Sequence, residues 1–307
     1  MKKGSKILII GRDSLTGHAL STRLKADGYK TILAMPLEGL MSQGIVERFF
    51  KKNRPDYVFF MDVRSGGIAA NLNHPAEFIY DNLQAELNVI HSAYKAGVKK
   101  LLFMASSCAY PKNCPQPMKE EYILGGPLEP TSEAFAIAKI AGMKMCQYYN
   151  RQYGTDFACT IPATAYGPGD NFNPETSHVI PALIRKLHTA KINNQPKVTV
   201  WGSGKARREF IHVDDLADAA LFVMRKPGSL SILNIGSGAD ISIGELAGLL
   251  KDIINFKGKI YFDRTRPDGA AKKLLDITRL RSIGWRAKVD LETGLRDLYK
   301  GYVKHAV

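Results

Sequence analysis

The stretch Lys6-Ile-Leu-Ile-Ile-Gly-Arg-Asp-Ser-Leu-Thr-Gly17 decides the fold of this chain. The apolar run at residues 6–10 predicts a buried strand, and the amphipathic stretch at residues 16–28 predicts a helix. Gly11 and Gly17 stand at the two ends of the short turn that joins them. A strand, a tight glycine turn and a helix together form the first unit of a parallel α/β sheet.

The same alternation continues through the first 160 residues. Buried strands are predicted at residues 56–61, 100–105 and 156–161, and long helices at residues 75–97 and 132–153. We therefore expect an α/β fold built on a doubly wound, parallel, Rossmann-like sheet. Ligands of such sheets bind at the carboxyl ends of the strands.

The pattern changes after Pro162. Residues 166–174 are rich in turn-forming residues and suit a loop at a binding site. Shorter helices and strands are predicted at residues 179–191, 198–201, 213–224 and 243–254. We expect a Rossmann-like nucleotide-binding domain of residues 1–165 plus about 205–238, and a smaller substrate domain of about 166–204 plus 239–307.

The composition excludes several classes of protein. The 307 residues carry 43 Lys+Arg against 29 Asp+Glu, a formal net charge of +14, which suits either nucleic acid or a small phosphorylated substrate. The basic residues are scattered and no nucleic-acid motif accompanies them, so we expect no nucleic-acid partner. No apolar run approaches the roughly 20 residues of a membrane helix, and residues 7–10 are too short for a signal-peptide core. The four cysteines form no Cys-x-x-Cys pair, so we expect no metal site and a reduced, cytoplasmic setting.

The turn after the first strand is an altered dinucleotide-binding fingerprint. Gly11 and Gly17 match the outer glycines of G-x-x-G-x-x-G, in which backbone N–H groups approach a pyrophosphate, but the middle position is Ser14. The end of the second predicted strand, residues 33–38, offers no arginine for a 2′-phosphate and only Glu38 as an acid. This turn is stronger evidence for a Rossmann-like fold than for a bound cofactor. The alternative to a cofactor site is a tight turn that serves folding alone.

Many segments along the chain together match one family. They are Gly66-Gly-Ile with Asn71, and the segments at residues 75–82, 106–111, 116–118, 128–131, 136–142, 149–154, 170–172, 177–182, 201–204, 208–215, 266–269 and 273–276. Over essentially its whole length the chain resembles the GDP-L-fucose synthase family of extended short-chain dehydrogenases/reductases. Those enzymes epimerise GDP-4-keto-6-deoxymannose at C3 and C5 and then reduce C4 with NADPH.

The resemblance implies two catalytic residues for epimerisation, Cys108 and His178. A 4-keto group acidifies the hydrogens on both neighbouring carbons, and a thiolate and an imidazole can move those protons near neutral pH. Taken alone, Cys108 would be a small buried hydrophobe and His178 a helix N-terminal residue satisfied locally.

For the reduction, the resemblance implies a Ser-Tyr-Lys group, which is incomplete here. Ser106 and Lys139 match, but Thr131-Ser-Glu-Ala-Phe-Ala-Ile-Ala-Lys139 places Phe135 at the tyrosine position. A phenyl ring has no acidic proton to give. Phe135 is otherwise a neutral variation or an engineered substitution.

The departures from the family gather on the cofactor side. Besides Phe135 and Ser14, Asp13 replaces a basic residue, Pro36 stands near the missing arginine, and Asp62 replaces a small residue that faces the cofactor. Asp13 and Asp62 would bring negative charge close to the cofactor phosphates. The resemblance thus implies an NADP(H) site that is weakened.

The positions that the family uses for substrate binding match better than those for the cofactor. The resemblance implies that a GDP-sugar site is formed by Asn171, Lys186, Trp201, Arg208 and Lys273. Trp201 would either support the base or pack in the core, which is the commoner role of tryptophan. Thr164 and Gly169 replace an asparagine and a histidine that lie near the sugar in the family, so the resemblance does not fix the identity of the sugar.

We expect an epimerase of a GDP-linked 4-keto sugar that inverts C3, C5 or both, needs no cofactor for that step and has lost or weakened its reductase step. One alternative is a bifunctional NADPH-dependent epimerase/reductase. Another is a catalytically silent GDP-sugar-binding subunit that partners an active relative. The resemblance also implies a homodimer through the two long helices.

Overall fold

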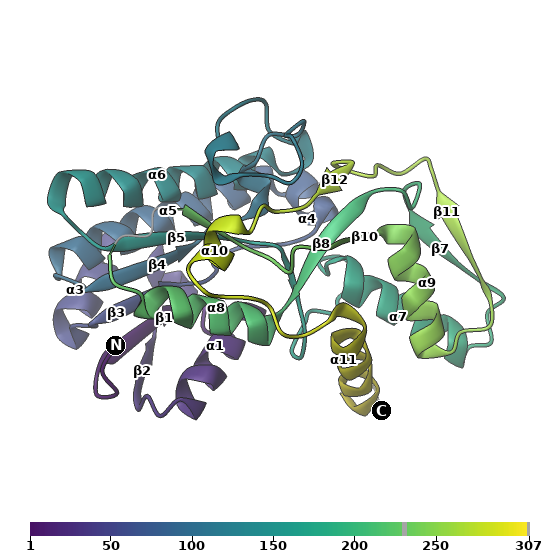
Figure 1. The fold of residues 1–307 in the computed structure, drawn as a ribbon, viewed down its shortest axis with the longest axis horizontal. Helices are drawn as coiled ribbons and strands as arrows, with labels where there is room; N and C mark the ends of the chain where they lie inside the picture. The colour runs from purple at the N-terminus through teal and green to yellow at the C-terminus, as the bar shows by residue number, and fades with distance from the viewer. Residues whose placement is uncertain (229–231, 306–307) are drawn as a thin grey trace.

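The computed structural model describes residues 1–228 and 232–305, and its centre is a six-stranded sheet (Figure 1). The order is β2-β1-β3-β4-β5-β9, and every neighbouring pair is parallel. The strands are β1 (Lys6–Ile10), β2 (Thr31–Ala34), β3 (Tyr57–Phe60), β4 (Lys100–Met104), β5 (Phe157–Pro162) and β9 (Ile232–Ile235). The expected doubly wound, Rossmann-like sheet is confirmed.

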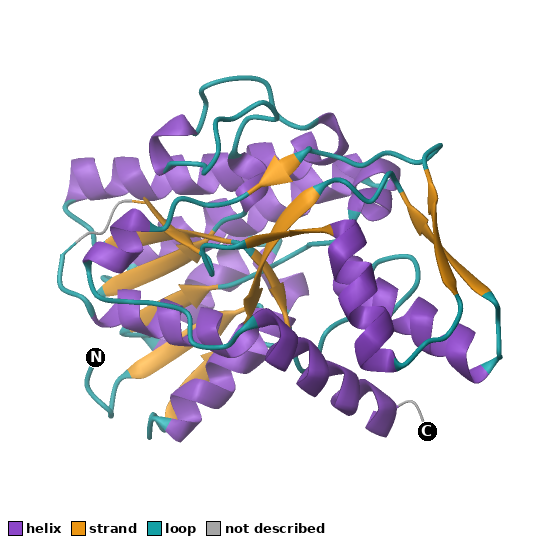
Figure 2. Ribbon diagram, turned by 45° about the vertical axis from the view of Figure 1, so that its right-hand side comes forward, coloured by secondary structure: helices purple, strands orange, loops and turns teal. Residues whose placement is uncertain are grey.

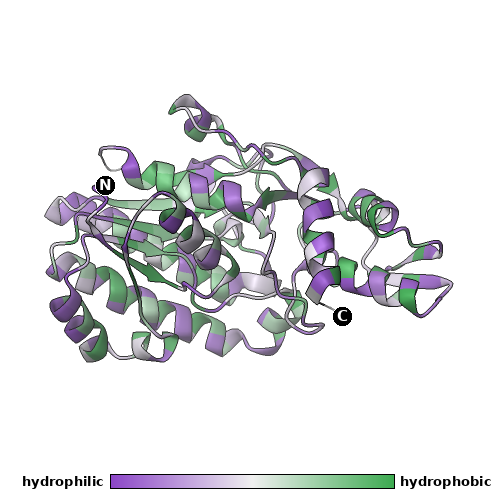
Figure 3. Ribbon diagram, turned by 90° about the horizontal axis from the view of Figure 1, so that it is seen from below, coloured by the Kyte–Doolittle hydropathy of each residue, from purple (hydrophilic) through white to green (hydrophobic). Residues whose placement is uncertain are grey.

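Helices cover both faces of this sheet (Figure 2). On one face, α5 (Pro75–Lys95) packs between α3 (Gln43–Asn53) and α6 (Glu133–Tyr153). On the other, α1 (Leu15–Ala26) packs against α8 (Val213–Arg225). Because both faces are covered, the strands are continuous apolar runs, and Figure 3 shows them as apolar between more polar helices.

A second core lies beside the first. The strands β7 (Lys197–Trp201) and β11 (Lys259–Asp263) form a parallel pair. The helices α7 (Val179–Ile192), α9 (Ile243–Ile254) and α11 (Leu291–His305) belong to this half of the molecule (Figure 1). Its buried side chains include Leu187, Leu250, Phe256 and Leu295.

A small sheet runs between the two cores. It has the order β10-β8-β12, with β6 pairing along β8, and consists of β6 (Thr164–Tyr166), β8 (Arg207–His212), β10 (Asp240–Ser242) and β12 (Lys272–Lys273). Sequence reasoning placed the return of the chain to the main sheet at about residues 205–238. Within that range α8 and β9 join the main fold, whereas β8 belongs to this small sheet.

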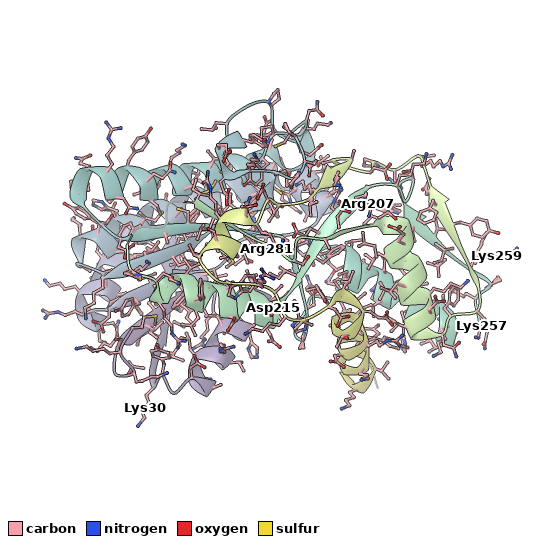
Figure 4. The ribbon with its side chains drawn as sticks, in the orientation of Figure 1. Lys30, Arg207, Asp215, Lys257, Lys259 and Arg281 are labelled. Atoms are coloured by element: carbon pink, nitrogen blue, oxygen red, sulfur yellow. The ribbon has the colours of Figure 1, made fainter. Side chains whose placement is uncertain are left out.

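The end of the chain contributes to both cores. Leu280 of α10 (Thr278–Ser282) and Trp285 are buried in the first core, and Leu295 of α11 in the second. The carboxylate of Asp215, which is labelled in Figure 4, accepts the N–H groups of Lys288 and Val289 between them. The proposed division into two domains stays a prediction.

The remaining helices are short: α2 (Leu37–Leu40), α4 (Ile68–Asn73), and the single turns η1 (Ser107–Ala109), η2 (Glu120–Tyr122) and η3 (Pro130–Ser132). Among the described helices, none combines the length and the apolar character that crossing a bilayer requires.

Candidate active site

Cys108 lies in η1, directly after strand β4, and is surrounded by polar groups. Its N–H donates to Ser106 Oγ at 3.2 Å, and Lys273 Nζ donates to its Sγ at 3.7 Å. Burial raises the pKa of the Cys108 thiol, but the positive charge of Lys273 and hydrogen bonds with Ser106, Ser132 and Lys273 outweigh it and leave the pKa lowered. This cysteine therefore differs from an inert buried one.

A second cation stands beside Lys273. Strands β12 and β8 are parallel neighbours in which Lys273 is paired with Arg208. Arg208 donates through Nη1 to the Arg207 carbonyl at 2.8 Å and through Nη2 to the Asp268 carbonyl at 3.1 Å. Burial lowers the pKa of Arg208, while the charges of Asp268 and Cys108 act in the opposite direction.

His178 lies in a different electrostatic setting. It occupies the position just before α7, where burial lowers the pKa of its imidazole and the charge of Asp62 opposes that shift. Asp62 follows β3, and its carboxylate accepts the Val63 N–H at 2.9 Å and the Ser65 hydroxyl at 2.7 Å. A Cβ atom built on Gly67 would lie 3.1 Å from the Ser177 carbonyl, so the segment after Asp62 runs close to His178.

The start of α4 lies near segments of both groups. A Cβ atom on Gly269 would meet Arg208 Nη2 at 3.3 Å and Ile68 at 3.5 Å, and η3 packs on α4. No hydrogen bond or ion pair joins Cys108 to His178 within residues 1–228 and 232–305. The structure therefore gives each member of the predicted pair its own charged neighbour, Lys273 for Cys108 and Asp62 for His178.

Phe135 and Lys139 lie in an apolar layer under this edge of the sheet. Phe135 is 9% exposed and meets Phe78 edge to face, with ring centroids 6.1 Å apart. Lys139 Nζ lies 5.5 Å from the Phe135 ring centroid and 2.9 Å from Glu86 Oε1. Burial raises the pKa of Glu86 to about 7, and the Lys139 charge opposes that rise. In the part of the chain that the structure describes, Glu86 is the hydrogen-bond partner of Lys139, and Ser106 is not.

The glycines of the first turn are required by close packing. Gly11 has φ +72°, and a Cβ atom on it would clash with the backbone of Asp62, which brings the turn and Asp62 together. A Cβ atom on Gly17 would clash with the Gly11 carbonyl. Ser14 caps α1: its hydroxyl donates to the Gly11 carbonyl at 2.7 Å and accepts the Gly17 N–H at 3.2 Å.

This turn fits a dinucleotide pyrophosphate in part. The backbone has the required shape, but the Gly17 N–H, which a phosphate at the start of α1 would otherwise use, already donates to Ser14. The positive charge of Arg12 is paired with Asp13 at 3.2 Å, and the Asp13 side chain is exposed. Glu38 is exposed in the first turn of α2.

Trp201 is a surface residue and not part of either core. Its side chain is 52% exposed, which excludes the core role. Lys186 Nζ lies 5.8 Å and Arg266 Cζ 4.9 Å from its ring centroid. Both distances are in the range of cation–π contacts. Arg266 was not predicted as a site residue, although it opens the matching segment at residues 266–269.

One loop connects Trp201 to Cys108. The Asp268 carboxylate accepts the Ser203 N–H at 2.8 Å and the Ser203 hydroxyl at 2.7 Å, and Arg208 donates to the Asp268 carbonyl. The result is a series of cations, the basic strip, which leads from the tryptophan to the cysteine and consists of Lys186, Arg266, Arg208 and Lys273.

Asn171 organises its own loop. Its Nδ2 donates to Thr176 Oγ1 at 2.8 Å, and its Oδ1 accepts the Asn173 N–H at 2.9 Å. In the described residues these are its side-chain bonds, and neither reaches the basic strip. Thr164 lines a small cavity together with Ser107 and Lys273, close to Cys108.

Known proteins resemble this chain over its full length. The family model described as "NAD dependent epimerase/dehydratase family" matches residues 7–236. Putative GDP-L-fucose synthase 2 of Arabidopsis thaliana is 48% identical over 100% of this chain and 94% of its own. GDP-L-fucose synthase of Escherichia coli K12 is 43% identical over 98% of this chain and 97% of its own.

Two solved structures are similar to this chain over almost its whole length. MlghC, a GDP-mannoheptose C4 reductase from Campylobacter jejuni with NADP bound, has a TM-score of 0.90 at 38% identity, covering 99% of both chains. A GDP-6-OMe-4-keto-L-xylo-heptose reductase from C. jejuni has a TM-score of 0.94 at 37% identity, again covering 99% of both chains.

Proposed function

Because the chain belongs to the NAD dependent epimerase/dehydratase family and its relatives include GDP-L-fucose synthases, we propose that it is an enzyme acting on a GDP-linked 4-keto sugar. The names of those relatives favour the complete reaction, epimerisation followed by NADPH-dependent reduction, as the first candidate. An epimerase without a working reductase step, which we expected from the sequence, is the second candidate, and Phe135 is the observation that favours it. Both candidates act on a GDP-linked 4-keto sugar, and the single observation that supports this shared substrate is the basic strip, which ends at Cys108.

The proposed substrate orientation follows the basic strip. The guanine base lies against the exposed face of Trp201, and the diphosphate meets the cations that continue toward Cys108. The 4-keto sugar then reaches the end of the strip at Lys273, which contacts Cys108 and lines a small cavity with Ser107 and Thr164. This orientation uses the net positive charge of the chain for a phosphorylated substrate.

Epimerisation in this proposal is a pair of proton transfers. Cys108 removes a proton from a carbon beside the keto group, an enolate forms, and His178 returns a proton from the opposite face. Ser106 lies beside the cysteine and can donate its hydroxyl to the enolate oxygen. Lys139 has no part in this step, because its charge is paired with the buried Glu86.

NADPH, when bound, would supply the hydride that reduces the keto group. The residues that would hold it are the Gly11–Gly17 turn and the start of α1, and we propose that Ser14 and Asp13 weaken this site. The proton that accompanies the hydride cannot come from Phe135, so it comes from Lys139, Ser106 or water.

The proposed assembly is a homodimer in a reducing, cytoplasmic compartment. The outward faces of α5 and α6 carry the exposed apolar side chains Tyr80, Leu87, Ile137 and Tyr148, which a second copy would cover. Cys108 must remain a free thiol for the chemistry described above, and it is free here. A silent binding subunit is the remaining candidate and would bind GDP-sugar without turnover.

Product analysis tests this function. The protein is incubated with GDP-4-keto-6-deoxymannose and NADPH, and consumption of the reduced nicotinamide is followed together with the sugar products by mass spectrometry. A reduced GDP-sugar supports the first candidate, and epimerised keto sugar without NADPH consumption supports the second. Recovery of unchanged substrate contradicts both for this sugar.

A further inference from the structure

We propose that Lys273 is a positioning residue that keeps Cys108 in its thiolate form before substrate arrives. The inference rests on the proposed function, in which Cys108 removes the proton. It gives Lys273 a role other than the diphosphate contact that the resemblance implied.

The geometry places the ammonium group on the sulfur. Lys273 Nζ lies 3.7 Å from Cys108 Sγ, although the two residues are 165 positions apart in the chain. Strand β12 pairs in parallel with β8, with Lys273 beside Arg208, so neighbouring strands each supply a cation at this point. Arg208 and Cys108 also interact electrostatically, since the charge of Cys108 raises the pKa of Arg208 against burial.

The strand that carries Lys273 is anchored on both sides. Lys272, the preceding residue, pairs with Asp240 at 2.9 Å, and Asp240 also accepts from Arg207 at 2.8 Å, which is labelled in Figure 4. The Leu274 N–H donates to Gln116 Oε1 at 2.9 Å. These contacts hold the backbone of Lys273 in place, so its side chain reaches the thiol without help from a ligand.

The neighbours that shift the pKa of the Cys108 thiol against burial are the ammonium group of Lys273, on β12, and the hydroxyls of Ser106, which precedes η1, and Ser132, which precedes α6. Arg208, on β8, carries a second positive charge that interacts with Cys108, and the acids Asp268 and Glu129 also act on Arg208. Glu209 lines the same small cavity as Lys273 and Ser107. Burial alone would raise the pKa of the thiol, and these neighbours lower it instead. Within residues 1–228 and 232–305, no lysine or arginine hydrogen-bonds to Cys114, Cys146 or Cys159, and burial raises the pKa of Cys114 and Cys146.

The proton transfer balances with Lys273 as a spectator. The thiolate sulfur takes the proton of the carbon beside the keto group, an S–H bond forms as the C–H bond breaks, and the electron pair moves onto the enolate oxygen. His178 in its protonated form then gives a proton to the opposite face of that carbon. The thiol and the neutral imidazole return to their starting forms by proton exchange with water, and Lys273 keeps its proton throughout.

Alkylation of Cys108 in the substrate-free protein tests this role directly. The rate of iodoacetamide labelling at Cys108 is measured by peptide mass spectrometry as a function of pH for wild type and for Lys273→Met, Lys273→Arg and Lys272→Met. Lys273→Met should shift the labelling midpoint to higher pH and slow labelling at neutral pH by about tenfold for each pKa unit. Lys273→Arg should keep most of the wild-type behaviour, and Lys272→Met, which loses only the half-exposed ion pair with Asp240, should change the labelling profile far less than Lys273→Met.

Two outcomes would overturn the proposal. One is an unchanged labelling profile in Lys273→Met together with a raised KM, which would leave Lys273 as a diphosphate contact. The other is an equal change in Lys272→Met, which would show a general disturbance of β12. Lys273→Gln serves if the methionine variant does not fold, as judged by circular dichroism. Because labelling needs no substrate, an incorrect choice of sugar would make the test of the proposed function fail but would leave this test unaffected.

Discussion

The ammonium group of Lys139 lies 2.9 Å from the carboxylate of Glu86, and both side chains are buried. Lys139 stands one helical turn after Phe135, at the spacing by which a lysine would act on a tyrosine hydroxyl. With a phenyl ring at position 135, the lysine has Glu86 as its hydrogen-bond partner in the described chain. Lys139 therefore forms a buried ion pair with Glu86, and its part in proton transfer stays a prediction.

The substitution Phe135→Tyr should restore the missing proton donor. The ring is already packed edge to face against Phe78, and Lys139 already lies within reach of it. General acid groups contribute about 100-fold or more to a rate, so NADPH oxidation with a GDP-4-keto sugar should rise by that order. The measurement is loss of reduced nicotinamide absorbance, with Phe78→Tyr as a control in the same layer. An unchanged rate would mean that the phenol is not what limits reduction.

Removing the charge of Glu86 should destabilise the fold. Glu86→Gln leaves the buried Lys139 ammonium without its counter-charge, which costs about 3–5 kcal/mol in comparable sites. Urea unfolding followed by circular dichroism measures this loss. Glu47→Gln breaks the exposed pair with Lys95 and should leave the unfolding free energy unchanged. Equal losses in the two variants would contradict a special role for the buried pair.

Asp62 should control the titration of His178. The carboxylate raises the pKa of the imidazole against the effect of burial, so Asp62→Asn should lower that pKa. If His178 must be protonated to act as the acid, activity is lost as the pH rises through this pKa, and the alkaline limb of the epimerisation profile should move to lower pH. NMR titration of the His178 ring gives the pKa itself. Asp13→Asn, an exposed change, should leave both measurements as in wild type.

Ser14→Gly should improve cofactor binding. The substitution frees the Gly17 N–H and removes a side chain from the turn, so NADPH should bind about tenfold more tightly, the value of one hydrogen bond to a charged group. The cost to stability should be a few tenths of a kcal/mol, because glycine is also a good helix cap. Titration calorimetry measures the affinity. Ser42→Gly changes a helix-start residue whose side chain makes no cap bond and should have no effect on it.

Trp201→Ala should weaken substrate binding without unfolding the chain. Loss of one aromatic stacking surface costs about 1–3 kcal/mol, so the Kd for GDP should rise by roughly tenfold or more. Tyr261, which is 51% exposed on the neighbouring strand β11, provides the control variant Tyr261→Ala. Equal GDP affinity in Trp201→Ala and wild type would remove Trp201 from the proposed orientation.

The sequence predicted correctly those strands and helices whose positions follow from the spacing of apolar residues alone. The strand at residues 6–10 and the helices near residues 75–97 and 132–153 appear as expected, because their apolar spacing alone dictates which side is buried. The amphipathic helix α3 and the C-terminal helix α11 were missed. The exposure of Trp201 could not be predicted, since it depends on how β7 lies against β11 and the loop carrying Arg266.

Contacts between distant residues decide the rest. The neighbours of Cys108 include Lys273, and the partner of Lys139 is Glu86, 53 positions away on another helix. A sequence pattern gives each residue a probable element but no partner across elements, because the register of β12 against β8 and the packing of α5 on α6 are set by the whole fold. One signal was present: Glu86 is an acid on the buried side of α5, where only a paired charge is tolerated.

Deuterium exchange in D2O tests the central claim most directly, since epimerisation needs no nicotinamide. The protein is incubated with GDP-4-keto-6-deoxymannose alone, and C3 and C5 are examined by mass spectrometry and proton NMR. We predict deuterium at C3, C5 or both in wild type, and none in Cys108→Ser or His178→Asn. Absence of deuterium from the wild-type reaction, or uptake in the two variants equal to that of wild type, would contradict the account of Cys108 and His178 as the proton-transferring pair.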